Sequence, residues 1–180
     1  MKRGNVFRIT SAVLISALLA GSLSACVSSK PAEGTPGSAA LSPASVDSSR
    51  GVKVGFVWPL TGGSATIGQQ HNDGALMAIE EINANGGIKS MGGKKIVPVT
   101  ADSETKPDVG ASQVERMITK EGVAAVVGCY NSSVSFTASE TAQRYKTPFI
   151  SQGGVKNEIT ERGYDWIFRV NNKATYDVEE

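Results

Sequence analysis

The hydrophobic and polar positions that follow residue 50 alternate between two periods. Short apolar runs rich in β-branched residues predict strands, and segments with apolar residues three and four apart predict helices. The two patterns alternate along the chain, which predicts repeated strand–helix units. The expected strands are residues 52–58, 95–101, 123–127, 148–151 and 166–170, and the expected helices are 72–85, one opening at Pro107 and ending before Gly122, 133–145, and the first turns of another over 174–180.

Three details of the pattern predict how these elements pack. Ala75, Ala78, Ile79 and Ile82 fall on one face of the first helix, which predicts its buried side. The apolar run 123–127 is uninterrupted, as in a strand covered on both faces. Pro98 cannot donate to a ladder of hydrogen bonds, which favours a sheet edge for its strand. We therefore expect an α/β fold with a doubly wound parallel sheet in the order 2-1-3-4-5.

Three segments rich in Gly, Ser and Asn follow the first, third and fourth expected strands. They span residues 60–68, 129–133 and 152–155. Ligands of doubly wound sheets bind at the carboxyl ends of the strands, where the strand order reverses. In the order 2-1-3-4-5 that point lies between strands 1 and 3, so these segments are the candidate binding loops.

The first of these loops does not match a phosphate-binding motif. Gly63 and Gly68 have the spacing of a P-loop, but Gln69 and Gln70 stand where Lys and Ser or Thr are required. No GxGxxG motif follows the first strand either. The glycines favour close approach of the backbone to a small ligand, and a flexible turn is the alternative.

The second and third loops offer hydrogen-bond donors. Backbone N–H groups at the start of the helix over 133–145 can bind an anion, and Ser132 can add a hydroxyl donor. The alternative is that Asn131 or Ser132 only caps this helix. Gly153 and Gly154 expose backbone groups without side-chain obstruction, and a plain turn is again the alternative.

Catalytic, metal and cofactor sites find no support in the residues. Ser132 has no plausible His–Asp relay, and His71, the only histidine, is expected to be solvated at the start of the first helix. With one His and two Cys, neither a metal cluster nor an internal disulfide of the mature chain is expected. We therefore expect no enzyme, no metal and no cofactor.

The first 26 residues have the organisation of a secretory signal. Lys2, Arg3 and Arg8 precede an apolar stretch over 9–23 that is too short and polar for a comfortable membrane span. The ending Leu-Ser-Ala-Cys resembles the lipobox of bacterial lipoproteins, which implies cleavage after residue 25 and lipidation of Cys26. An ordinary signal with a chance cysteine is the alternative.

Residues 26–50 are rich in Ser, Ala and Pro and contain no aromatic residue, which predicts a flexible tether before a folded region over 51–180. Removal of the signal leaves 15 of the 18 Lys and Arg residues against 17 Asp and Glu, a formal net charge of −2. Such a chain has no electrostatic reason to bind nucleic acid or an anionic membrane, so membrane attachment would depend on lipid.

Several segments together resemble the periplasmic binding proteins for branched-chain amino acids, the solute receptors of ABC importers. They are VGFVWPLTGG with a following IG, ALMAIEEINANGGI, VVGCYNSSVS, TPFISQGG and EITERGYDWIFRV. The resemblance covers about residues 52–180. It implies an extracytoplasmic receptor that closes two α/β lobes on a small ligand, with the chain ending before the second lobe.

The resemblance also implies which residues contact the ligand. Ser132, beside Asn131, occupies the place of the carboxylate-binding serine. Gly153, Gly154 and Val155 occupy the places of the backbone groups that bind the ligand's ammonium and carboxylate.

Two departures leave the ligand open. Val155 stands where a threonine hydroxyl is frequent, and Ile67 stands where an aromatic residue often packs on the ligand. The implied ligand is an amino acid, with an amide or urea as the alternative.

The implied partner is an ABC permease, and the implied location is the outer side of the membrane, reached through the lipid anchor. A ligand-sensing module of the same fold that acts on a signalling partner is the alternative function.

Overall fold

The computed structural model describes residues 51–175. The expected signal over 1–25, the tether over 26–50 with Cys26, and residues 176–180 of the last expected helix lie outside the described residues. No helix within 51–175 is long and apolar enough to cross a membrane.

Strands and helices alternate from Val52 to Arg169, as the sequence predicts. Each expected strand and each expected helix before residue 174 is present, with bounds shifted at several ends. The elements are β1 (Val52–Trp58), α1 (Ala65–Ala84), η1 (Lys89–Met91), β2 (Ile96–Asp102), α2 (Pro107–Arg116), η2 (Met117–Glu121), β3 (Ala125–Gly128), α3 (Ser132–Arg144), β4 (Phe149–Ser151), η3 (Asn157–Ile159) and β5 (Ile167–Arg169).

The five strands form one parallel sheet in the order β2-β1-β3-β4-β5. This confirms the expected fold class and strand order. Among the described residues β2 is an edge strand, where the missing N–H of Pro98 costs the sheet no hydrogen bond. The order reverses between β1 and β3, whose registers bring Val57 beside Gly128. The carboxyl ends of these two strands are therefore neighbours.

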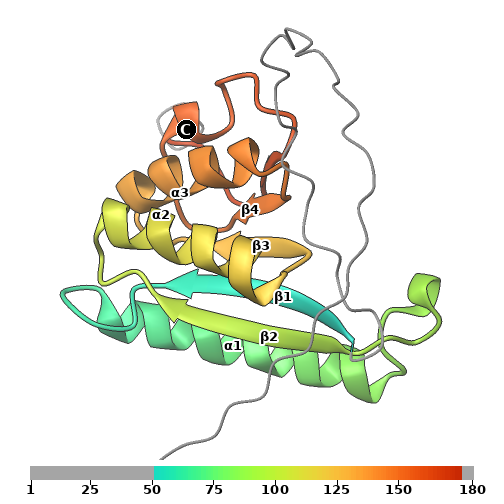
Figure 1. Cartoon of the computed structure of the whole chain (residues 1–180). Helices are drawn as coiled ribbons and strands as arrows, with labels where there is room; N and C mark the ends of the chain where they lie inside the picture. The colour runs from blue at the N-terminus through green and yellow to red at the C-terminus, as the bar shows by residue number, and fades with distance from the viewer. Residues whose placement is uncertain (1–50, 176–180) are drawn as a thin grey trace, which may run out of the picture. The chain divides into compact units, whose positions relative to one another are not determined.

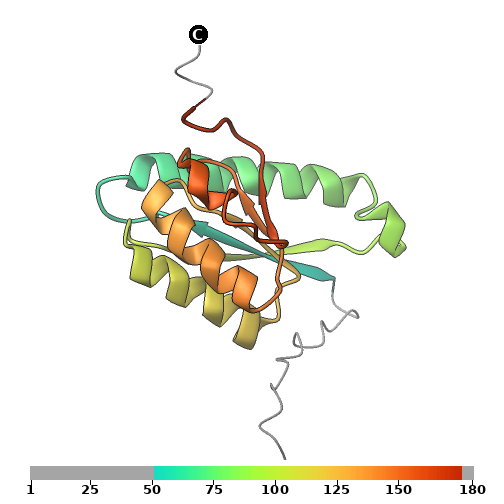
Figure 2. The same cartoon turned by 90° about the horizontal axis from the view of Figure 1, so that it is seen from above.

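Helices cover the two faces of the sheet unequally. Helix α1 lies on one face, and α2 and α3 lie side by side on the other (Figures 1 and 2). The larger core lies under α2 and α3, where Val57, Val114, Val126, Val134 and Phe149 are completely buried. Phe56, Trp58 and Ile79 form a smaller core under α1.

The α1 face differs from the expectation. Ile79 is buried as predicted, but Ala78 is exposed and the Ile82 side chain is 41% exposed. Helix α1 packs on β1 and β2, so Phe168 of β5, which points to the opposite face from the buried Ile167, is 50% exposed. One helix on this face cannot cover all five strands.

The uninterrupted apolar run 123–127 gives a strand that begins later than expected. Strand β3 starts at Ala125, because the N–H of Val123 donates to the carbonyl oxygen of Met117 and ends the preceding helix. Its residues are alternately buried and partly buried. The expectation of burial on both faces is therefore wrong for Val127, which lies on the face that α1 covers incompletely.

The first helix begins seven residues earlier than the sequence predicts, at Ala65 instead of residue 72. Its first turn includes residues 65–68, the end of the glycine-rich stretch that was expected to be loop. Gly68 is buried there, and a Cβ at this position would lie 2.1 Å from the carbonyl oxygen of Pro59. The glycine thus lets the helix pack directly against the end of β1, although glycine lowers helix propensity.

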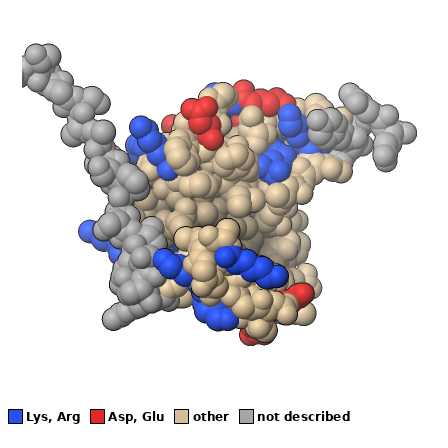
Figure 3. Space-filling model, turned by 90° about the vertical axis from the view of Figure 1, so that its right-hand side faces the viewer, with Lys and Arg blue, Asp and Glu red and all other residues tan. Residues whose placement is uncertain are grey.

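The face seen in Figure 3 carries several separate Lys and Arg side chains with uncharged residues between them. Acidic side chains lie among them at the top of this view. The charges on this face therefore do not merge into one continuous positive field of the kind that binds a phosphate backbone.

We predict that Gly68→Ala destabilises the protein by roughly 1–3 kcal/mol, because the methyl group must displace the backbone at Pro59. Urea unfolding followed by circular dichroism measures the change. Gly74→Ala is the matched control, since a Cβ there meets nothing within 4 Å and alanine favours the helix by about 0.5–1 kcal/mol. Equal stability of the two variants would contradict the close packing at Gly68.

Candidate functional site

Three segments at the carboxyl edge of the sheet lie in hydrogen-bonding contact. The Asn131 amide after β3 donates from Nδ2 to Ser64 Oγ before α1, over 3.4 Å. Ser132 at the start of α3 contacts the segment after β4. The switch point between β1 and β3 thus brings together all three loops that the sequence singles out.

Ser132 holds the loop after β4 through its hydroxyl oxygen. Its Oγ accepts hydrogen bonds from the N–H of Val155 at 3.1 Å and of Lys156 at 3.4 Å. With the oxygen occupied by two donors, the hydroxyl hydrogen remains available to another acceptor. Ser132 therefore combines a structural contact with a donor that a ligand can use.

Asn131 occupies the N-cap position of α3 without capping it through its side chain. Its Nδ2 is directed to Ser64, and its Oδ1 is buried without a hydrogen-bond partner. The interpretation of Asn131 as only a helix cap does not describe this geometry. The side chain instead links the loops after β1 and β3.

The two glycines after β4 are required by close packing. A Cβ at Gly153 would lie 3.0 Å from the Cα atom of Tyr130, and one at Gly154 would lie 2.8 Å from Ile159 and from Ser135. Gly154 is buried, whereas the side chain of Val155 is exposed. The loop thus lies directly against the segment after β3, with the Val155 side chain exposed.

Ile67 lies on the first turns of α1 and is 36% exposed. His71 follows it by four residues on the same face of the helix. The His71 ring lies 5.6 Å from the rings of Trp58 and Tyr130, and its Nδ1 is 3.3 Å from Gln152 Nε2. Helix α1 therefore contributes a side chain to the place where the loops after β3 and β4 meet it.

The expectation that His71 is solvated is wrong. Its ring is partly buried, and this burial lowers the pKa of the imidazole. With the helix expected to begin at residue 72, the contacts of His71 with Tyr130 and Gln152, which lie in the expected binding loops, were not predicted. With a helix beginning at residue 65, the spacing of Ile67 and His71 would have placed them together.

Asp102 at the end of β2 organises the loop after β1. One carboxylate oxygen accepts from the N–H groups of Leu60, Thr61 and Glu104 at 2.8, 3.2 and 2.8 Å, and the other accepts from Thr61 Oγ1 at 2.6 Å. Burial by itself would raise the pKa of Asp102, but these hydrogen bonds together lower it. No motif in the sequence singles out Asp102.

The three loops carry little charge of their own. Residues 60–68, 129–135 and 151–156 contain a single charged side chain, Lys156. The first N–H groups of α3 and the Ser132 hydroxyl are donors suited to an anion such as a carboxylate. In residues 51–175, no group of three or more His, Cys, Asp or Glu side chains could hold a metal ion.

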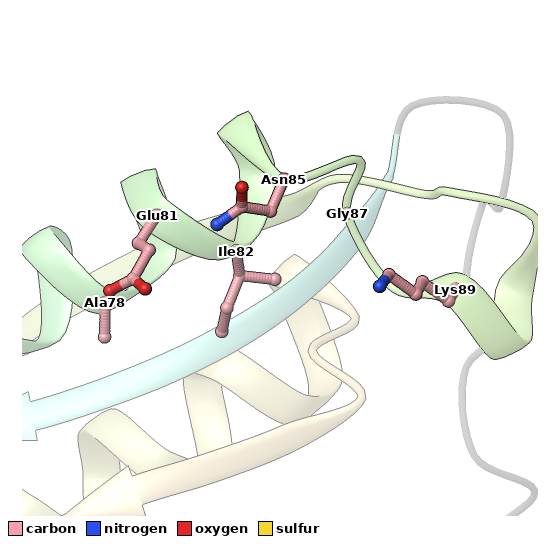
Figure 4. A pocket seen from close by; sticks show the side chains of 6 residues that line it. All are labelled: Ala78, Glu81, Ile82, Asn85, Gly87 and Lys89. Atoms are coloured by element: carbon pink, nitrogen blue, oxygen red, sulfur yellow. The ribbon is translucent and has the colours of Figure 1, made fainter.

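A groove of about 430 Å³ lies elsewhere, beside the C-terminal half of α1. Figure 4 shows Ala78 and Ile82 on the helix and Lys89 on the segment beyond Gly87. Its lining includes none of the residues of the three loops. The groove is therefore separate from the candidate site.

We predict that Asp102→Asn lowers the free energy of unfolding by about 1–2 kcal/mol at neutral pH, because the neutral amide binds the three N–H groups more weakly. The folded-state pKa is below the unfolded value near 4, so this stability is present above pH 4 and lost as the pH falls further. Urea unfolding from pH 7 to pH 3 should show the two proteins converging.

Asp165→Asn is the control, since Asp165 is exposed. A stability difference between wild type and Asp102→Asn that persists below the folded pKa would argue against the carboxylate as its source.

A family model described as periplasmic binding protein matches residues 51–179. Among related proteins, the Leu/Ile/Val-binding protein homolog 7 of Brucella abortus (strain 2308) is 34% identical over 137 residues, which are 76% of this chain and 33% of that protein.

Solved structures agree with this assignment. The branched-chain amino acid transporter substrate binding protein LivJ of Streptococcus pneumoniae, in complex with isoleucine, matches with a TM-score of 0.64 and 32% identity over 68% of this chain and 34% of its own. A solute binding protein of an ABC transporter from Rhodopseudomonas palustris BisB5, in complex with 3,4-dihydroxy benzoic acid, has a TM-score of 0.61 and 26% identity over 68% and 32%.

The chain spans about a third of the length of the relatives it matches. The matched region coincides with the described α/β unit and includes all three loops of the candidate site. The family consists of ligand-binding proteins and not of enzymes, as expected from the sequence. The fold and the matches together place this chain in the periplasmic binding protein family.

Proposed function

We propose that the protein is an extracytoplasmic solute receptor of an ABC importer, which binds a small polar ligand such as a branched-chain amino acid between this lobe and a second one. The observation that carries the proposal is Ser132. Its oxygen is occupied by two backbone donors, and its hydrogen is left for a ligand at the start of α3. A carboxylate is the group that these donors suit best.

The relatives support this class of ligand. Solved structures similar to this chain contain isoleucine and, in a protein from Desulfitobacterium hafniense, Leu. A third relative holds 3,4-dihydroxy benzoic acid, which also carries a carboxylate. The shared chemical group favours a carboxylate as the part of the ligand that meets Ser132.

The rest of the ligand is less constrained by this lobe. Val155 offers no hydroxyl to an ammonium group, and Ile67 offers a smaller apolar contact than an aromatic ring. An amide or urea is the second candidate class, because the Ser132 hydroxyl can donate to a carbonyl oxygen as well as to a carboxylate.

The proposed partner is the permease of the importer, and the proposed location is the extracytoplasmic side of the membrane. The Leu-Ser-Ala-Cys ending of the signal supports a lipid anchor at Cys26, with residues 26–50 as the tether. The lipobox favours a transport receptor over a signalling module, because a tethered receptor needs no membrane span of its own.

We predict that Ser132→Ala in the full-length protein weakens ligand binding by roughly 1–3 kcal/mol, through loss of a hydrogen bond to a charged group. Isothermal titration calorimetry with L-leucine, L-isoleucine and L-valine measures it. Ser133→Ala is the matched control, since Ser133 is the exposed next residue of the same helix turn. Equal affinities of wild type and Ser132→Ala would count against the site.

We predict that Cys26 carries acyl chains in the mature protein, because the residues before it match a lipobox. Mass spectrometry of the N-terminal peptide from membrane extracts should show a mass increase and a mature chain that begins at Cys26. Cys26→Ser should release the protein from the membrane fraction. An unmodified Cys26 in membrane extracts would refute the anchor.

A further inference from the structure

Arg169 lies next to the loop that follows β4. It is the last residue of β5 and pairs with Ser151, the last residue of β4. The N–H of the next residue, Val170, donates to the Ser151 carbonyl oxygen at 3.0 Å. The Arg169 side chain therefore begins next to the point where the loop leaves the sheet.

The guanidinium group binds two backbone carbonyl oxygens of that loop. It donates from Nη1 to the carbonyl oxygen of Gly154 and from Nη2 to that of Lys156. A longer contact of 3.4 Å joins Nε to Thr160 Oγ1. No carboxylate of the described residues lies within ion-pair distance of Arg169, so its charge acts on the loop backbone.

The segment that follows β5 continues this contact. Asn171 Nδ2 also donates to the Gly154 carbonyl oxygen, at 3.2 Å, and the N–H of Ala174 donates to the Val155 carbonyl oxygen at 2.9 Å. The carbonyl groups of three successive loop residues, Gly154, Val155 and Lys156, thus accept hydrogen bonds from residues 169–174.

The opposite edges of the same peptide groups face Ser132. In a planar trans peptide the C=O and N–H bonds point in opposite directions. The Gly154 carbonyl binds Arg169, while the N–H of Val155 in the same peptide group binds Ser132 Oγ. The next peptide group repeats the arrangement, with the Val155 carbonyl on Ala174 and the Lys156 N–H on Ser132.

We propose that Arg169 is a positioning residue for the binding loop: by holding the Gly154 carbonyl, it fixes the plane of the Gly154–Val155 peptide group and thereby aims the Val155 N–H at Ser132. This orients the oxygen of Ser132 and leaves its hydrogen directed to the ligand. That Arg169 orients the loop follows from the geometry alone. That it thereby affects ligand binding rests on the proposed function.

A lysine at position 169 could not make the same hydrogen bonds as Arg169. A guanidinium group has five N–H donors in a rigid fork and can bind the Gly154 and Lys156 carbonyls together. A lysine ammonium is a point charge on a flexible stem, so it keeps the charge without fixing both carbonyls. Arg169→Lys therefore tests orientation with the charge retained.

The first measurement uses no ligand. Hydrogen exchange of the full-length protein should be about tenfold faster at the Val155 and Lys156 amides in Arg169→Lys than in wild type, as expected for one lost charged hydrogen bond. Exchange in α2 should not change. Arg144→Lys is the matched control, because Arg144 lies exposed on α3 and pairs with Glu115.

The second measurement is the affinity for L-leucine, L-isoleucine and L-valine by calorimetry. Arg169→Lys should weaken binding about tenfold. The loss caused by Ser132→Ala should be smaller in the Arg169→Lys background than in wild type, since both residues act through one loop. Low, non-denaturing guanidinium chloride should partly restore binding to Arg169→Ala, whereas sodium chloride should not.

Three results would overturn the proposal. They are unchanged exchange at the Val155 and Lys156 amides in folded Arg169→Lys, strictly additive losses in the double variant, and failure of both Arg169→Lys and Arg169→Ala to fold, which would make Arg169 merely structural. If wild type binds none of the three amino acids, that result tells against the proposed ligand, and the exchange rates alone decide the role of Arg169.

Discussion

The reversal of strand order between β1 and β3 is the constraint on which the candidate site depends. From this point α1 leaves toward one face of the sheet and α3 toward the other. The carboxyl ends of the two strands are therefore neighbours, with the start of one helix on each side. The contact of Ser64 with Asn131 between two of the loops, and that of His71 on α1 with Gln152 in the third, follow from this arrangement.

Two charged side chains of opposite sign bind the backbone of two of these loops. Asp102 accepts hydrogen bonds from N–H groups of the loop after β1, and Arg169 donates hydrogen bonds to carbonyl groups of the loop after β4. Each comes from the end of a neighbouring strand, so the sheet itself holds both loops. Both charged groups bind backbone atoms of the loops. The donors that remain for a ligand are therefore the Ser132 hydroxyl and the N–H groups of the first turn of α3.

The sequence was sufficient for the order of elements and for the loops that meet. Alternating apolar periods predicted the strands, and Pro98 predicted the edge position of β2 correctly. The start of α1 could not be read in the same way. The composition around Gly62, Gly63 and Gly68 is typical of a loop. The contact of Gly68 with Pro59 explains why Gly68 nevertheless lies in the helix.

The hydrogen-bond partners of individual side chains could not be predicted from the sequence, for a related reason. Asp102 lies 41 residues from Thr61, and Arg169 lies 15 from Gly154, so no local period joins them. The residue pattern determined the parallel α/β sheet, its strand order and its three polar loops, because hydrophobic periodicity and turn residues act locally. Only the tertiary structure decided that Ser132 and Arg169 hold opposite edges of the same peptide group, because that depends on how strand ends meet in space.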